Sequence, residues 1–339
     1  MTHNLPPLPA GMKIAAQITP EPSDLELNFL KQMGVEYVVL WTSGDKASYD
    51  YYASRRALFE AAGLKIYGFG SFSVHNQDEI VLNLPGRDEK IEEYKQHLRN
   101  LGKAGIPYTT YAHMANGIWS TQREFARGGA SARAFDLAKA DKGWWVGREY
   151  SGPLTHERIY SQEEIWENFK HFIKEVVPVA EEAGVRIGIH PDDPPVSELG
   201  GVPRCIFSSF EGYRRALEIA DSPNVGICLC VGCWLEGGSG MGKDVFETIR
   251  YFGERKKLFK VHFRNVDQPL PHFVETFIDD GYMDMYKVVK ALRQVDFDGV
   301  MIADHIPLMA DDHRLGTAYT IGYMKALLSR VNAEAGQPS

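Results

Sequence analysis

The chain has 339 residues, of which 44% are hydrophobic and 24% are charged, and its formal net charge is −8 with histidine neutral. This composition suffices for one large α/β domain, and no run of Lys and Arg is long enough to indicate a nucleic-acid or anionic-membrane surface. No apolar stretch approaches the length of a transmembrane helix, and the first residues lack the apolar segment of a signal peptide, so we expect a cytoplasmic protein.

The predicted elements alternate along the chain between short apolar runs and longer amphipathic runs, which are typical of buried strands and surface helices respectively. Several amphipathic runs end in Gly just before the next apolar run, the usual signal for the end of a helix. Ser161 followed by Glu164 predicts a capping box at the start of the longest helix. The predicted strands are residues 13–18, 36–41, 65–69, 108–113, 186–190, 225–230, 259–264 and 300–304.

Eight strand–helix units in one chain predict an α/β fold, a (β/α)₈ TIM barrel that forms a single domain over residues 1–339. A doubly wound open sheet is the alternative, but eight strands without a G-x-G-x-x-G phosphate loop favour the barrel. One further helix follows the last predicted strand, and residues 333–339 are expected to form a disordered tail.

One connection is much longer than the others. Residues 114–160 follow the fourth predicted strand and contain three Trp and many Arg and Gly residues. Loops of this length in compact domains usually cover a site or form an interface, and this insertion belongs on the C-terminal face, where barrel active sites lie. We therefore expect a lid, a subunit contact in a homo-oligomer (a dimer or higher), or both.

Four polar residues stand at the C-terminal ends of predicted strands: His190, Cys230, His262 and Asp304. In a barrel these strand ends gather at one face. Two imidazoles, a thiolate and a carboxylate that meet there can bind a divalent transition metal, and Zn²⁺, Mn²⁺, Fe²⁺ and Co²⁺ all accept such ligands. The sequence therefore predicts a metal site at the mouth of the barrel.

The two-residue period of a strand tests one of these ligands further. In residues 259–264, Lys260, His262 and Arg264 share one face, and three apolar side chains share the other. The apolar face suits packing against helices, so the polar face points into the barrel, where it is costly unless water, a metal or an anion meets it. This favours a functional role for His262 over a structural one.

The last predicted strand places Asp304 at the mouth, with His305 beside it at the rim. A carboxylate at this position is a typical ligand or base, and capping of the following helix is the alternative. His305 is a candidate general acid or base, or else a simple loop histidine. Asp192 and Asp193 directly follow His190 and are either turn residues or partners that orient an imidazole.

The cysteines do not fit a disulfide framework, because Cys228, Cys230 and Cys233 lie within six residues, and we expect reduced thiols. A structural zinc site is also incomplete, because no second cysteine pair accompanies the C-x-C-x-x-C pattern. On chemistry alone, Cys230 is either a metal ligand or a small buried apolar residue.

Several segments together resemble the mannonate dehydratase family, whose wider relatives are the xylose-isomerase-like barrels. In chain order they are HPDDPPVSELGGVPR, GICLCVGC, VHFRNV, FVETFIDDGYMDMYKVVKAL and ADH, with a weaker match upstream at YAHMANGIW. The resemblance implies dehydration of D-mannonate to 2-keto-3-deoxy-D-gluconate. It also implies a divalent metal, Mn²⁺ with Fe²⁺, Co²⁺ or Zn²⁺ as alternatives, bound by His190, Cys230, His262 and Asp304.

The resemblance implies roles for further residues. The catalytic His of the family falls on His305, and Tyr319 is the nearest candidate for its catalytic Tyr. The residues expected to bind the substrate are Arg264, Lys260, Arg204, Trp119 and His113. The chain departs from the family pattern at Ile278, Ile302 and Ala303 and lacks the Arg expected shortly after Trp119, which indicates altered contacts with the substrate.

Three functions are compatible with these residues. The first is metal-dependent dehydration of a sugar acid, mannonate or a close relative. The second is a metal-dependent isomerase, epimerase or eliminase that acts on a neutral or keto sugar through the same enolisation chemistry. The third is a barrel that keeps the metal for stability or binds sugar without turnover, and retention of His305 beside Asp304 argues against it. The expected partner is a small sugar or sugar acid, with neither a nucleic acid nor a membrane.

Overall fold

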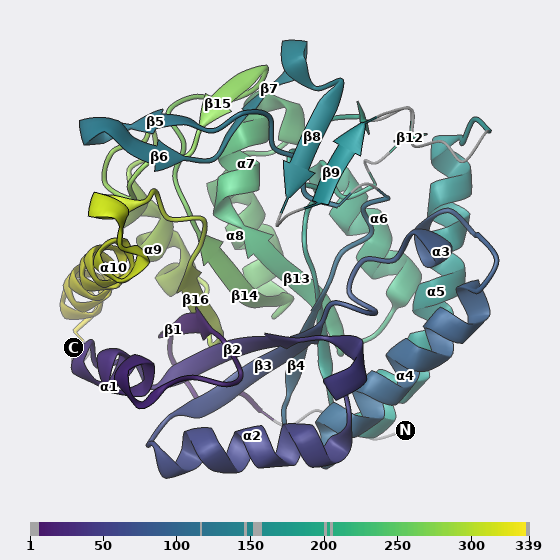
Figure 1. Ribbon diagram of the computed structural model, residues 1–339, viewed down its shortest axis with the longest axis horizontal. Coiled ribbons are helices and arrows are strands. Elements are labelled where there is room, and N and C mark those ends of the chain that lie inside the picture. Colours follow the sequence, from purple (N-terminus) through teal and green to yellow (C-terminus); the bar gives the residue numbers. More distant parts are fainter. Residues whose placement is uncertain are drawn as a thin grey trace.

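The computed structural model describes residues 7–115, 117–145, 148–151, 158–199, 202–203 and 206–336. Eight parallel strands form one sheet in the order β3-β2-β1-β16-β14-β13-β10-β4. The two end strands, β3 and β4, lie side by side, so the sheet nearly closes into a barrel with helices around it (Figure 1). The predicted TIM-barrel fold is therefore confirmed. The barrel strands are β1 (Lys13–Ile18), β2 (Tyr37–Thr42), β3 (Lys65–Ser71), β4 (Tyr108–Tyr111), β10 (Arg186–Ile189), β13 (Val225–Cys230), β14 (Leu258–Phe263) and β16 (Val300–Ala303).

Most of the described α-helices begin where a side chain accepts from one of the first free N–H groups; α3 and α4 do not. The Ser161 hydroxyl accepts from the N–H of Glu164, whose carboxylate accepts in return from the N–H of Ser161, which confirms the predicted capping box. The helices are α1 (Asp24–Gln32), α2 (Tyr49–Ala61), α3 (Asp78–Val81), α4 (Arg87–Lys103), α5 (Gln162–Ala183), α6 (Phe210–Ala220), α7 (Val231–Gly237), α8 (Val245–Glu254), α9 (Met285–Gln294) and α10 (His313–Glu334).

The core has two apolar layers. The larger one packs the outer faces of the strands against the helices. The smaller one fills the barrel and consists of Ala15, Val39, Tyr67, Tyr108, Phe259, Val300 and Ile302. The two-residue period of a strand predicts that Phe259 and Val261 share the outer face, but Phe259 belongs to this inner cluster. A register shift between β13 and β14 at this point is the reason, because a bulge turns one extra side chain inward.

The insertion lies across one end of the barrel, at the top of Figure 1. It forms short antiparallel pairs, and its strand β7 pairs with β15 in the segment that follows β14. The insertion is thus attached by main-chain hydrogen bonds to the barrel side that carries His262. The short strands are β5 (Glu124–Ala126), β6 (Ala130–Ala132), β7 (Ala134–Asp136), β8 (Lys142–Trp145), β9 (Arg148–Ser151), β11 (Glu198–Leu199), β12 (Val202–Pro203) and β15 (His272–Val274).

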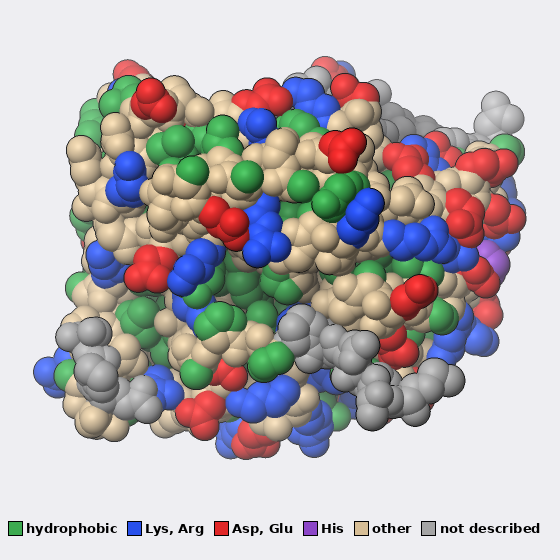
Figure 2. Space-filling view, turned by 90° about the horizontal axis from the view of Figure 1, so that it is seen from below, with side chains coloured by type: hydrophobic (Ala, Val, Ile, Leu, Met, Phe, Trp, Pro, Cys, Tyr) green, Lys and Arg blue, Asp and Glu red, His purple; other side chains and the backbone are tan. Residues whose placement is uncertain are grey.

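The predicted disordered tail, residues 333–339, does not begin at residue 333, because α10 continues to Glu334, and residues 337–339 lie outside the described residues. The Glu334 carboxylate accepts hydrogen bonds from Lys290 and Arg330, which hold this last turn. Within the described ranges, no helix is long and apolar enough to cross a membrane. The end of the barrel away from the insertion, seen from below in Figure 2, carries Lys, Arg, Asp and Glu side chains mixed around an apolar hollow.

Candidate metal centre and acid–base site

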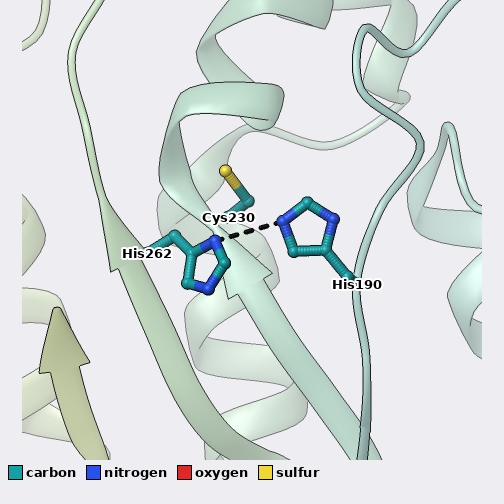
Figure 3. A group of neighbouring side chains, drawn as sticks. All are labelled: His190, Cys230 and His262. Atoms are coloured by element: carbon teal, nitrogen blue, oxygen red, sulfur yellow. Dashed lines mark hydrogen bonds between the residues drawn. The ribbon is translucent and has the colours of Figure 1, made fainter. Parts of the chain in front are cut away.

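The predicted ligands converge at the C-terminal ends of four neighbouring strands. The ligand atoms of His190, Cys230 and His262 all lie within 4.8 Å of one another. Figure 3 shows these side chains at the ends of adjacent strands, with Nε2 of His190 facing Nδ1 of His262 at 3.1 Å. Asp304 follows β16 and lies beside two members of this group, with its Oδ2 3.6 Å from Nδ1 of His262 and 4.0 Å from Sγ of Cys230.

Hydrogen bonding orients the first imidazole for metal binding. Nδ1 of His190 lies 2.7 Å from the carbonyl oxygen of Pro191, and a carbonyl only accepts, so this nitrogen carries the proton. The lone pair of the neutral ring is then on Nε2, which faces His262. A main-chain carbonyl behind a histidine ligand is the usual way in which proteins fix the tautomer that binds a metal.

Local charges favour the metal-binding protonation states. Burial and the charge of Lys260 hold the pKa of His262 well below its usual value. Burial by itself raises the pKa of Cys230, but hydrogen bonds and the charge of Arg264 bring it well below the value of a free thiol. Burial likewise opposes ionisation of Asp304, and His305 and Arg264 outweigh it, so the pKa of Asp304 is lowered. Neutral imidazole, thiolate and carboxylate are the forms that bind divalent metals.

The donor set therefore fits a divalent cation. Two imidazole nitrogens 3.1 Å apart match the spacing of two ligands that share one ion at about 2.1 Å. The mixture of nitrogen, sulfur and oxygen donors suits Zn²⁺, Mn²⁺, Fe²⁺ or Co²⁺ and does not select one of them.

His305 stands beside this cluster in a strained backbone conformation. Its φ is +44°, a left-handed value that non-glycine residues adopt rarely and mostly where neighbours impose it. Glu275, which is fully buried, lies 2.8 Å from Nδ1 of His305, and Nε2 lies 3.8 Å from Oδ1 of Asp304. Burial lowers the pKa of His305, but the carboxylates of Asp304 and Glu275 more than offset it, and the pKa is raised overall.

A pocket of about 250 Å³ opens onto this histidine. Asp304 and His305 form one wall, and Gln17 comes from the end of β1. The remaining lining residues belong to the loop after β16 and to α10: Ala303, Ile306, Pro307, His313 and Thr317. The pocket therefore joins a predicted metal ligand and a predicted acid–base residue to one small-molecule space.

Beyond the C-terminal ends of β10 and β14 lies a buried network of five ionisable residues: Arg133, Asp193, Glu236, Arg264 and Glu275. The Arg133 guanidinium, from the insertion, donates to Asp193 at 2.6 Å and to Glu275 at 2.8 Å. Arg264 donates to Glu236 at 2.6 Å and to Asp193 at 3.1 Å. Asp193, Cys233 and Glu236 are spaced closely enough for a metal, but two guanidinium groups already supply the positive charge there.

Arg264 thus has partners other than the expected substrate. Its guanidinium is 1% exposed and also donates to Asp304 at 2.8 Å. It acts here as an internal cation that holds a metal ligand and the buried carboxylates together. Lys260 is fully buried in the barrel, and among the described residues its Nζ has no hydrogen-bond partner. Burial lowers the pKa of Lys260, because it penalises the charged form.

Two other expected site residues, His113 and Trp119, lie outside the metal cluster and its pocket. His113 is on the outer face of the barrel, where it bonds the Tyr111 hydroxyl and packs edge-on against Phe169 of α5, so it does not face the lumen. Trp119 is fully buried against Gly143 of the insertion, where a Cβ on that glycine would lie 2.1 Å from its Nε1. Both side chains are therefore parts of the scaffold in this structure.

Tyr319 lies on α10, is 36% exposed, and its hydroxyl accepts from Arg127 of the insertion at 3.5 Å. It does not line the pocket beside His305. Arg204 falls outside the described residues.

The sequence reasoning missed the residues that support the site. Glu275 had a visible signal, because a lone Glu within the apolar run HFVETF is a residue type that is almost never buried without a partner. Arg133 had no such signal. It is one of several arginines in the insertion, and only the fold shows that it reaches the barrel while Arg123 stays exposed.

Comparison with known proteins identifies the family. The model of the D-mannonate dehydratase (UxuA) family matches residues 12–143 and 151–333. The chain belongs to the D-mannonate dehydratase family. A mannonate dehydratase of Streptococcus equi subsp. zooepidemicus is 37% identical over 265 residues, which cover 73% of this chain and 71% of the relative.

Solved structures support the same family and fold. A mannonate dehydratase from Streptococcus suis serotype 2 has a TM-score of 0.84 and 28% identity, with 97% of each chain covered. A xylose isomerase domain protein from Alicyclobacillus acidocaldarius has a TM-score of 0.63 at 14% identity, with 95% of this chain and all of that chain covered, and it shows the fold alone. The resemblance seen in the sequence is confirmed, and membership of the D-mannonate dehydratase family makes the protein a hydro-lyase.

Proposed function

We propose that the protein dehydrates D-mannonate to 2-keto-3-deoxy-D-gluconate with a divalent metal, Mn²⁺ in the first instance, held by His190, Cys230, His262 and Asp304. One observation carries the proposal. The ligand atoms of His190, Cys230 and His262 lie within 4.8 Å of one another, Asp304 lies beside them, and Asp304 and His305 line a small pocket, in a member of the D-mannonate dehydratase family.

The chemistry needs one proton removed and one delivered. A bound divalent cation supplies Lewis-acid stabilisation of the negative charge that develops on the substrate carboxylate and the C2 oxygen. Dehydration takes the proton from C2 and gives a proton to the C3 hydroxyl, which leaves as water, and the resulting enol then becomes the 2-keto acid. General acid–base groups placed within hydrogen-bond reach typically contribute about 10²- to 10⁴-fold to such steps.

His305 is our candidate for one of these transfers. Glu275 holds its Nδ1, so Nε2 is the nitrogen left to exchange a proton with a substrate in the pocket. Tyr319 is the candidate for the second transfer, although in this structure its hydroxyl bonds Arg127. Lys260 stands two residues before the ligand His262, and among the described residues its Nζ has no hydrogen-bond partner. It is therefore our candidate for a cation that binds the substrate.

One observation favours a second candidate function. Arg264 is committed to internal ion pairs, and the described lining of the pocket contains no Lys or Arg to bind a substrate carboxylate. A neutral or keto sugar requires no such cation. A metal-dependent isomerase, epimerase or eliminase that uses the same enolisation therefore remains the alternative proposal.

A substrate panel separates the two proposals. Protein loaded with Mn²⁺ is incubated with D-mannonate, with its C2 and C3 epimers, and with keto sugars, and products are identified by NMR and by a thiobarbiturate assay for 2-keto-3-deoxy acids. We expect a 2-keto-3-deoxy acid from D-mannonate, and a loss of about 10²- to 10⁴-fold in His305→Asn protein whose metal content is unchanged. Turnover of a keto sugar with none of mannonate would replace the first proposal by the second.

A further inference from the structure

The dithiol sequence Cys230-Val231-Gly232-Cys233 begins helix α7, and only its first cysteine belongs to the proposed metal site. Cys230 ends β13 and is also the N-cap of α7, where its Sγ accepts from the N–H of Cys233 at 3.4 Å. In Figure 3 the sulfur of Cys230 points toward the first turn of that helix. A C-x-x-C pair at the start of a helix is the arrangement that thiol–disulfide proteins use for reversible oxidation.

The geometry of the turn suits a disulfide. Residues three apart on a helix are neighbours, and a disulfide joins Cα atoms that are about 5.5–6 Å apart. Cys233 has no ligand role in the proposed metal site, and its Sγ contacts Nη2 of Arg264 at 3.5 Å. Gly232 permits this contact, because a Cβ there would lie 2.1 Å from Nε of Arg264. The chain therefore keeps a second thiol in the same turn as the ligand thiol.

The pocket comes close to this pair and is the route that the proposal requires for a small oxidant. Both cysteines are fully buried, but Sγ of Cys230 lies 4.0 Å from Oδ2 of Asp304, and Asp304 lines the pocket. A metal bound to Sγ occupies the sulfur lone pair that otherwise attacks an oxidant. Occupation by the metal and oxidation of Cys230 are then mutually exclusive, a consequence that rests on the proposed function.

We propose that Cys230 and Cys233 form an oxidation site that closes to a disulfide when the metal is absent and hydrogen peroxide is present. The Cys230 thiolate attacks peroxide and the O–O bond breaks, which gives a sulfenic acid and a hydroxide ion. The hydroxide takes up the proton that the Cys230 thiol released on ionisation and becomes water. Sγ of Cys233 then attacks that sulfur, the S–O bond breaks, and a second water leaves. The dithiol loses two electrons and two protons, and one peroxide becomes two waters. The disulfide removes one metal ligand, and a thiol reductant restores it.

Mass spectrometry and thiol counting test the proposal. Residues 216–243 form one tryptic peptide that contains Cys228, Cys230 and Cys233, and the whole chain has four cysteines. We expect chelator-treated protein exposed to peroxide to lose two free thiols, and this peptide to become 2 Da lighter. Dithiothreitol should reverse both changes. Absence of the 2 Da change in the chelated wild-type protein would overturn the proposal.

Two matched variants identify the pair. Cys228→Ser protein should still form the disulfide, whereas Cys233→Ser protein should not, and Cys230 should instead gain oxygen. A 2 Da loss that persists in Cys233→Ser protein would overturn the assignment. Mn²⁺-loaded protein, with its metal content measured independently, should oxidise at least tenfold more slowly. If the protein binds Mn²⁺ but oxidises at the same rate, the proposed competition between metal and oxidant is wrong. If the protein binds no metal, the proposed function fails. In that case the mass of the tryptic peptide still shows whether the disulfide forms.

Discussion

Replacement of Arg133 tests whether the insertion is anchored through the buried charge network. The guanidinium is 3% exposed and donates to Asp193, Glu275, the Ser120 hydroxyl and the carbonyl of Trp119, at distances from 2.6 to 2.9 Å. Arg133→Met keeps much of the side-chain volume but leaves three buried carboxyl groups, those of Asp193, Glu236 and Glu275, without this cation. Removal of one partner from a buried ion pair typically costs about 3–5 kcal/mol, because the remaining charge stays desolvated.

We therefore expect Arg133→Met to lower the free energy of unfolding by about 3–5 kcal/mol in urea titrations followed by tryptophan fluorescence. Arg123→Met is the matched control. Arg123 belongs to the same insertion and also makes two hydrogen bonds, to the hydroxyl and carbonyl of Ser131, but it is exposed. Its loss should cost about 0.5 kcal/mol or less. Equal costs for the two variants, or a cost under about 1 kcal/mol for Arg133→Met, would refute the reasoning.

Three further predictions follow from the buried charges and the exposed tyrosine. Burial and the neighbouring Asp193 hold the pKa of Glu236 well above its usual 4.5, so this residue loses stabilising free energy as pH rises through the raised pKa. Glu236→Gln should therefore change the free energy of unfolding by about 1 kcal/mol or less at pH 6 and become more stable relative to the wild type toward pH 8. A parallel pH dependence of the two proteins would contradict this expectation. Asp193→Asn, which removes one of the carboxylates that compensate Arg133 and Arg264, should cost about 3–5 kcal/mol in the same urea assay. Lys260→Met removes a buried amino group that has no hydrogen-bond partner among the described residues. The substitution should stabilise the chelated protein by about 1–3 kcal/mol. A net loss of stability would show that the charge of Lys260 is compensated. Tyr319→Phe should lower kcat on D-mannonate by about 10²-fold or more with an unchanged urea midpoint, and an unchanged kcat would remove Tyr319 from the mechanism.

Much of the fold was predictable from local patterns. The predicted ranges of β1 and β13 coincide with the observed strands, because hydrophobic period and flanking turn residues are local properties. The convergence of His190, Cys230, His262 and Asp304 was also predictable, because parallel strands in a barrel present their C-terminal ends on one face.

Other features depend on contacts between distant segments. Strand β4 ends at Tyr111, two residues before His113. The strand alternation therefore does not fix the direction of His113, which packs against α5 and does not face the lumen. Arg264 was expected to meet a substrate, because nothing in VHFRNV reveals that Asp193 and Glu236 come within hydrogen-bond distance of its guanidinium. The bulge that turns Phe259 inward likewise arises from register between two strands and not from either sequence alone.

The most direct test of the metal-dependent mechanism is D-mannonate dehydration by chelator-treated protein as Mn²⁺ is added back. We predict no product without metal, activity that saturates at about one Mn²⁺ per chain, and neither metal binding nor product in His262→Ala protein. Undiminished product formation in the chelated protein, or in His262→Ala protein, would contradict a metal-dependent mechanism at these strand ends.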